Sequence, residues 1–187
     1  MDDATARPSL APTHPGRVPS ALPEPPSRAR RPRARLRQLA ADQHGLFTSA
    51  QAQDAGIDRH GLRRWRETGE ISNVTRGVWS FASAPATERR AAMAVLLREG
   101  DDAALATSSA AALLGFGGFA LLPPHVMRIR SARDPKSRTG HTSTRFHAGH
   151  VTVIDALRVT TSARTLFDLA ARLHPERVAR LTDRCLS

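Results

Sequence analysis

Apolar residues recur with helical spacing in two short segments in the first third of the chain. Leu36 and Leu39 share one face of a helix predicted over residues 35–42. A second helix is predicted over residues 50–55, because Thr48–Ser49 precedes it with side chains suited to capping its N-terminus. The spacing therefore predicts two short helices in succession.

A third helix is predicted from an N-cap at Asp58 to about Thr68. Ile57 and Leu62 flank this cap at the positions of a hydrophobic staple, which fixes the direction in which the chain enters a helix. At 100° per residue, Leu62 and Trp65 lie on one side of the helix. We expect that side to face the core and the opposite side to face solvent.

A β-hairpin is predicted directly after the third helix. Ile71–Val74 and Gly77–Phe81 have the composition of short strands, and Thr75–Arg76 would form the tight turn between them. Three short helices followed by a hairpin is the order of a winged helix-turn-helix domain. In such domains the second helix of the pair enters the major groove of DNA. We therefore predict a DNA-binding domain over residues 34–83.

Arginines gather on the predicted exposed face of the third helix. Residues 36–83 hold six Arg and five Asp or Glu, a net charge of only +1, yet four of these Arg lie between positions 59 and 66. A basic stripe on this helix is the electrostatic footprint of DNA binding. The residues expected to contact DNA are Arg59, His60, Arg63 and Arg64, with Arg66 on the flank and Arg76 in the wing. The alternative is a charged face that serves solubility only.

The remaining residues, 84–187, mix helical and strand patterns and predict a small α/β domain. Helices are predicted over residues 85–98, 109–114 and 163–172, and from Pro175 onward. Strands are predicted over residues 125–131, 143–147 and 156–160. Expected caps are Thr107 or Ser108 for the second helix and Ser162 for the third, which should bury Leu166, Phe167, Leu169 and Ala170. The fold class is thus α+β, and the chain would end at Ser187 either as a natural short form or as a truncated product.

Composition adds a strong positive charge to this picture. The 187 residues include 28 Lys and Arg against 17 Asp and Glu, giving a formal net charge of +11. Residues 1–33 are rich in proline and arginine and are expected to form a disordered tail, as a DNA-binding arm or a solvated leader. No apolar run approaches the roughly 20 residues that span a bilayer. We therefore expect a cytoplasmic protein without a membrane partner.

A second basic segment lies in the predicted α/β domain. Its members are Arg128, Arg130, Arg133, Lys136, Arg138 and Arg145, and Asp134 is the one acidic residue among them. Such a cluster suits a nucleic acid, an acidic protein partner or a merely solvated hairpin.

No residue pattern predicts catalysis, a metal site or a cofactor. His141, His147 and His150 do not have the spacing of a zinc site and have no cysteine cluster beside them. Cys185 is the single cysteine, which excludes an internal disulfide. The chain is therefore predicted to bind other molecules and not to be an enzyme.

Several motifs together resemble the AbiEi family of antitoxins, in the form common in actinobacteria. They are residues 43–52, 55–60 and 69–79, then Ser108–Gly115 and Val159–Ala170. The resemblance spans about residues 40–187. It implies the antitoxin half of a type IV toxin–antitoxin system, with a winged helix-turn-helix that binds operator DNA.

The resemblance also implies roles for individual residues. The first helix of the helix-turn-helix would begin with Thr48, Ser49 and Gln51. Residues 161–168 would have a structural role or would face a partner protein. The implied function is a transcriptional repressor of its own operon, whose second domain acts against a nucleotidyltransferase-like toxin. Many longer relatives continue into an endonuclease-like domain, whereas this chain ends one helix after the last motif.

Two other functions remain open on sequence grounds. One is a protein-interaction module that neutralises such a toxin without specific DNA binding. The other is a truncated relative of a longer protein with an endonuclease-like domain. The operator sequence and the oligomeric state do not follow from the sequence.

Overall fold

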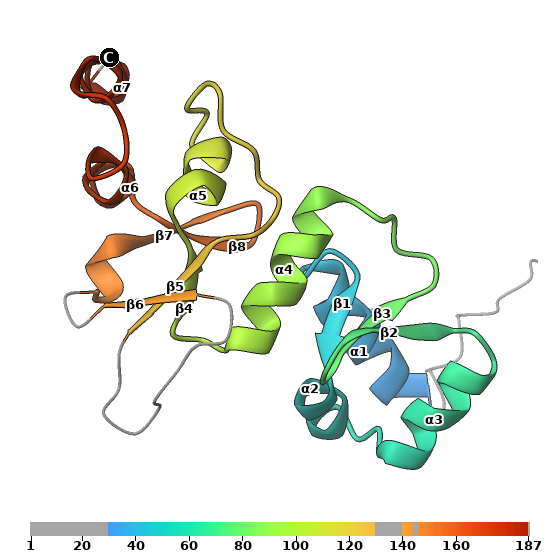
Figure 1. The fold of residues 1–187 in the computed structure, drawn as a ribbon. Coiled ribbons are helices and arrows are strands. Elements are labelled where there is room, and N and C mark those ends of the chain that lie inside the picture. The colour runs from blue at the N-terminus through green and yellow to red at the C-terminus, as the bar shows by residue number, and fades with distance from the viewer. Residues whose placement is uncertain (1–29, 130–139, 144–145, 187) are drawn as a thin grey trace, which may run out of the picture.

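The computed structural model describes residues 30–129, 140–143 and 146–186 (Figure 1). The predicted tail, except for its last residues, lies outside this range. Within it the chain forms seven α-helices and eight strands arranged in two sheets. The α+β fold class is confirmed.

The N-terminal unit has the element order of a winged helix. Its elements are α1 (Arg30–Ala41), β1 (Leu46–Thr48), α2 (Ser49–Asp54), α3 (Arg59–Glu67), β2 (Ile71–Thr75) and β3 (Val78–Phe81). The strands form an antiparallel sheet in the order β1-β3-β2. Helix α1 begins five residues earlier than the prediction, and the three-residue strand β1 was not predicted.

The caps of α2 and α3 form as the sequence predicts. Thr48 Oγ1 accepts a hydrogen bond from Gln51 N, and the Gln51 side chain accepts one from Thr48 N, which completes a capping box. Asp58 Oδ1 accepts from Gly61 N at 2.8 Å. Ile57 and Leu62 are both buried, as expected for a hydrophobic staple.

In the core of this unit, one side of each helix packs against the small sheet. Leu36, Phe47, Leu62 and Trp65 are buried there together. The Phe47 and Phe81 rings lie 5.1 Å apart between centroids. Tilted aromatic packing of this kind adds to the stabilisation from burial alone.

The C-terminal unit is built around a five-stranded mixed sheet. Its helices are α4 (Glu88–Glu99), α5 (Thr107–Leu113), α6 (Ser162–Ala170) and α7 (Pro175–Leu186). Its strands are β4 (Ala103–Leu105), β5 (Val126–Ile129), β6 (Gly140–Ser143), β7 (Val151–Ile154) and β8 (Leu157–Thr160), in the order β6-β5-β4-β8-β7. The pairs β4–β8 and β5–β6 are parallel, and the other pairs are antiparallel.

Helix α4 joins the two units, because it packs against strands of both sheets (Figure 1). Leu46 and Val78 of the small sheet share a hydrophobic cluster with Leu96 of α4 and Leu105 of the large sheet. Met93 and Ala94 are also buried, since both flanks of the helix are covered.

Several predictions about the C-terminal unit were wrong in detail. Strand β6 ends at Ser143, and His147 instead caps a 3₁₀ turn over Ala148–His150. Strands β4 and β7 were not predicted. The N-cap of α5 is Ala106, not Thr107 or Ser108, and an alanine side chain has no atom that can make a capping bond. Thr107 is buried at the first helical position, with φ +48°.

Helix α6 buries only part of the predicted set: Leu169 is buried and Leu166 is partly buried, as predicted. Its N-cap is Thr161, not Ser162, and its buried residues are Thr165 and Leu169. Phe167 is 73% exposed, and Ala170 is exposed as well. The reason is that α6 packs against α5 and α7, and this packing selects the side with Thr165 and Leu169.

Two independent features of the structure require glycine at position 45. The φ of Gly45 is +82°, and a Cβ there would lie 2.1 Å from Ala84 Cβ. We expect Gly45→Ala to lower the free energy of unfolding by about 2 kcal/mol or more, measured by thermal denaturation. Gly69→Ala is the control, since Gly69 has φ +73° but open space around it. Equal losses in the two variants would show that the contact with Ala84 has no effect.

Candidate nucleic-acid interface

Helix α3 presents a basic face to solvent. Leu62 and Trp65 are buried on its inner side, which confirms the predicted orientation. The exposed side chains on the helix are Arg59, His60, Arg63, Arg64, Arg66 and Glu67. Five of these six carry or can carry positive charge, so the helix can neutralise phosphates and reach base edges.

Arg63 is held by the one acidic residue of this face. Its Nε donates to Glu67 Oε1 at 2.8 Å, one helical turn away. This hydrogen bond, together with the charge of Glu67, raises the pKa of Arg63 above its ordinary value. Because the bond uses Nε, the two terminal nitrogens of the guanidinium stay available for a planar contact with an acceptor pair such as guanine O6 and N7.

The start of α2 is engaged in local contacts. Thr48 and Gln51 form the capping box, so their side chains have a structural role whatever else they bind. Ser49 is exposed, and its Oγ accepts a hydrogen bond from Trp79 Nε1 at 2.9 Å. Its backbone N–H donates to the Gly77 carbonyl at 2.9 Å.

The wing is the turn between β2 and β3. Thr75 pairs with Val78, so the turn residues are Arg76 and Gly77, one position later than predicted. Gly77 has φ +75°, which a glycine adopts without strain. Arg76 is exposed at this tip. Asn73 Nδ2 donates to the carbonyls of Thr75 and Val78 and ties the turn from within.

A hollow in the surface brings these elements together. It is lined from α2 by Ser49 and Gln53, from α3 by Arg59 and Arg63, and from β3 by Trp79. Sequence reasoning did not assign Gln53 or Trp79 to the interface. The local pattern held no clue to Trp79, because its position in the hollow depends on how β3 pairs with β1 and β2.

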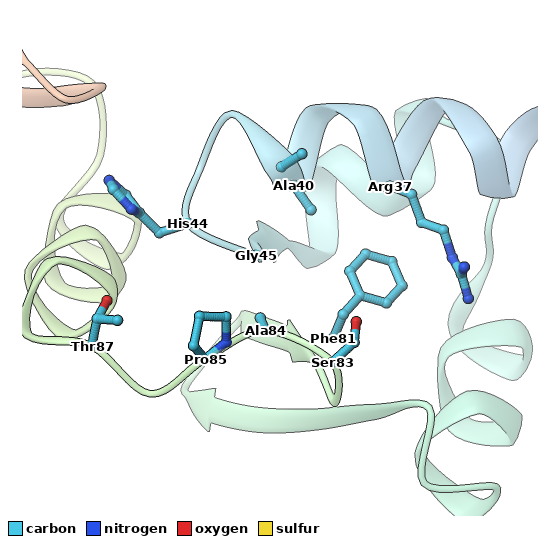
Figure 2. Close-up of a pocket in the computed structure, with 10 residues that line it drawn as sticks. Arg37, Ala40, His44, Gly45, Phe81, Ser83, Ala84, Pro85 and Thr87 are labelled. Carbon is cyan, nitrogen blue, oxygen red and sulfur yellow. The ribbon is translucent and has the colours of Figure 1, made fainter.

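A second hollow lies between the end of α1 and the connection from β3 to α4 (Figure 2). Its lining includes Arg37, His44, Phe81 and Pro85 but no residue of α3. His44 Nε2 is 2.8 Å from the Asp155 carbonyl, and Asp155 also pairs with Arg89 of α4. This hollow therefore borders the contact between the two units and does not belong to the basic face of α3.

Of the second basic segment, Arg128 alone lies within the described residues. Its Nη1 is 3.7 Å from Glu99 Oε2, and it is half-buried. Arg128 is therefore part of an ion pair on the large sheet. Arg130, Arg133, Lys136, Arg138 and Arg145 lie outside the described residues.

The histidine-rich segment forms a compact polar cluster in the C-terminal unit. The rings of His147 and His150 lie 3.7 Å apart, and Arg164 pairs with Asp168 beside them. Burial, with the neighbouring charges of His147 and Arg164, lowers the pKa of His150. Within the described part of the chain, no group of three His, Cys, Asp or Glu side chains is placed to hold a metal ion. The described helices include none long and apolar enough to cross a membrane.

The fold and the basic face of α3 place the N-terminal unit among winged helix-turn-helix domains. Residues 34–82 match the family described as "Transcriptional regulator, AbiEi antitoxin". This segment, about a quarter of the chain, is therefore similar to that family of transcriptional regulators.

The structure is also similar to the crystal structure of the RV2827C protein from Mycobacterium tuberculosis. The two share 18% sequence identity with a TM-score of 0.45, over 81% of this chain and 71% of that chain. No curated protein matches the chain.

Proposed function

We propose that this chain is a sequence-specific DNA-binding repressor of antitoxin type, which acts on the promoter of its own toxin–antitoxin operon. Residues 34–83 would form the DNA-binding unit and residues 84–187 the antitoxin-type unit. The observation that supports this proposal best is the exposed basic face of α3, directly opposite the buried Leu62 and Trp65.

The proposed mechanism divides the contacts into two kinds. Arg59, Arg63 and Arg64 approach the major groove with His60, and one or two of them read guanine edges. Arg76 in the wing, Arg66 on the flank and the start of α2 contact phosphates, which makes affinity strongly dependent on salt. The proposed activity is binding and includes no catalytic step.

A second candidate function is supported by one observation outside the DNA-binding unit. Phe167 on α6 is 73% exposed, and exposed alanines lie on the same helix. A large exposed aromatic side chain of this kind suits a protein partner. The candidate is binding of a nucleotidyltransferase-like toxin, either in place of specific DNA binding or in addition to it.

Fluorescence anisotropy with the DNA upstream of the protein's own gene tests the proposal. We expect tighter binding to this duplex than to a shuffled duplex of the same composition, at about 50 and 200 mM salt. Specific base contacts survive the higher salt, whereas contacts with phosphates alone weaken together on both duplexes. Equal, salt-sensitive binding to both would overturn the repressor and would favour the toxin-binding candidate.

A further inference from the structure

The Trp79 side chain lines the hollow between α2 and α3. Its Nε1 donates to Ser49 Oγ at 2.9 Å, across 30 positions of sequence. An indole N–H can only donate, so Ser49 Oγ is necessarily the acceptor in this bond. The direction of the bond fixes the orientation of the serine hydroxyl.

The Ser49 hydroxyl is thereby left with its proton free to donate outward. The side chain is exposed, and none of the described residues accepts a hydrogen bond from it. Of the polar groups at the start of α2, the Ser49 backbone N–H is used by the Gly77 carbonyl, and the Gln51 N–H is used by Thr48. The Ser49 hydroxyl is therefore a side-chain donor at this point that can reach an acceptor outside the protein.

The same two bonds connect the wing to the first helix of the DNA reader. Gly77 belongs to the wing turn and Trp79 to the strand that follows it, and both bond to Ser49. Arg76, at the tip, is adjacent to Gly77 in the chain. These bonds tie Ser49 to the backbone of the wing turn, next to Arg76.

We propose that Trp79 is a positioning residue of the DNA interface: its indole N–H orients the Ser49 hydroxyl to donate to a backbone phosphate and fixes the wing against α2. This inference rests on the proposed DNA binding and adds a residue that the basic pattern does not mark. The acceptor is a phosphate oxygen, because phosphates are the acceptors that a hydroxyl at this edge of the hollow meets in a bound duplex. A hydroxyl carries no charge, so its contact adds affinity without adding to the salt dependence.

The test compares Trp79→Phe, Ser49→Ala and the double variant with the unchanged chain in DNA anisotropy. Phenylalanine keeps an aromatic ring in place but removes the indole N–H. We expect each single variant to lose roughly tenfold in affinity for native and shuffled duplexes alike. The double variant should lose no more than Ser49→Ala, and the slope of affinity against salt should stay unchanged.

Two further variants serve as controls. Ser49→Thr keeps the hydroxyl and should retain most of the affinity. Ser83→Ala removes an exposed serine that lies in the other hollow and should bind as the unchanged chain does. Additive losses in Trp79→Phe and Ser49→Ala, or full affinity in either, would overturn the positioning role. If Trp79→Phe does not fold, Ser49→Ala and Ser49→Thr still test the positioning role, because neither variant alters the Trp79 ring.

A measurement without DNA separates this inference from the proposed function. The chain has two tryptophans, so two indole N–H resonances are expected in a nitrogen–proton correlation spectrum. Ser49→Ala should shift the Trp79 resonance and speed its exchange with solvent, while Trp65 is unaffected. An unchanged Trp79 resonance would overturn the positioning role even if the protein binds its operator. A shifted resonance in a protein that binds no DNA would overturn the proposed function, and the phosphate contact with it.

Discussion

Replacement of Phe47 by alanine is expected to lower the free energy of unfolding by about 3–5 kcal/mol. The Phe47 side chain is fully buried, at 0% exposure, in the core that supports α3. Its removal leaves a cavity against Phe81, whose ring centroid lies 5.1 Å away. Because the neighbours collapse only partly into such a cavity, the loss exceeds the transfer free energy of the ring.

Urea denaturation followed by tryptophan fluorescence measures this loss. Both tryptophans lie in the N-terminal unit, so the signal reports the unit that carries the mutation. Phe167→Ala is the control, and its unfolding is followed by circular dichroism because Phe167 lies in the other unit. That ring is 73% exposed, so its removal should change stability by no more than about 0.5 kcal/mol. Similar losses in the two variants would contradict the assignment of Phe47 to the core.

The second large effect is expected from replacing one arginine at a time in the proposed DNA interface. Arg63→Ala should weaken binding to the native operator by roughly 5- to 150-fold, with little change on a shuffled duplex, because it removes a contact with a base edge. Arg76→Ala should weaken binding to every sequence alike. It should also reduce the slope of log affinity against log salt concentration by about one, because one phosphate contact is lost. Anisotropy titrations over several salt concentrations measure both quantities.

Arg172→Ala controls for the loss of one positive charge, since Arg172 is exposed just after the end of α6, away from α3. It should leave the affinity for both duplexes nearly unchanged. If Arg63→Ala and Arg76→Ala weakened all sequences to the same degree, the placement of α3 in the major groove would be wrong.

Much of the winged-helix unit follows from short-range patterns. The N-caps of α2 and α3 involve side chains and backbone groups only three positions apart, so Thr48 and Asp58 are recognisable from the sequence. The burial of Leu62 and Trp65 follows from helical periodicity. The same periodicity places the arginines of α3 on its exposed side, where the structure also has them.

The C-terminal unit was less predictable, because its elements are shaped by contacts far apart in sequence. Strand β4 has three residues and is fixed by pairing with β5 and β8. Phe167 has the apolar character of a core residue, but α5 and α7 pack against the other side of α6. When a short helix has apolar residues on more than one face, its sequence does not determine which face the neighbouring helices cover.

The sequence by itself determined the helix caps, the order of elements over residues 34–83 and the position of the basic stripe on α3. Each of these depends on residues within about one helical turn of one another, where backbone geometry alone sets which side chains meet. Only the tertiary structure decided that Trp79 reaches Ser49 and that α4 is covered by both sheets. Those contacts join segments that are distant in the chain, and they form only where the strands pair and the cores pack together.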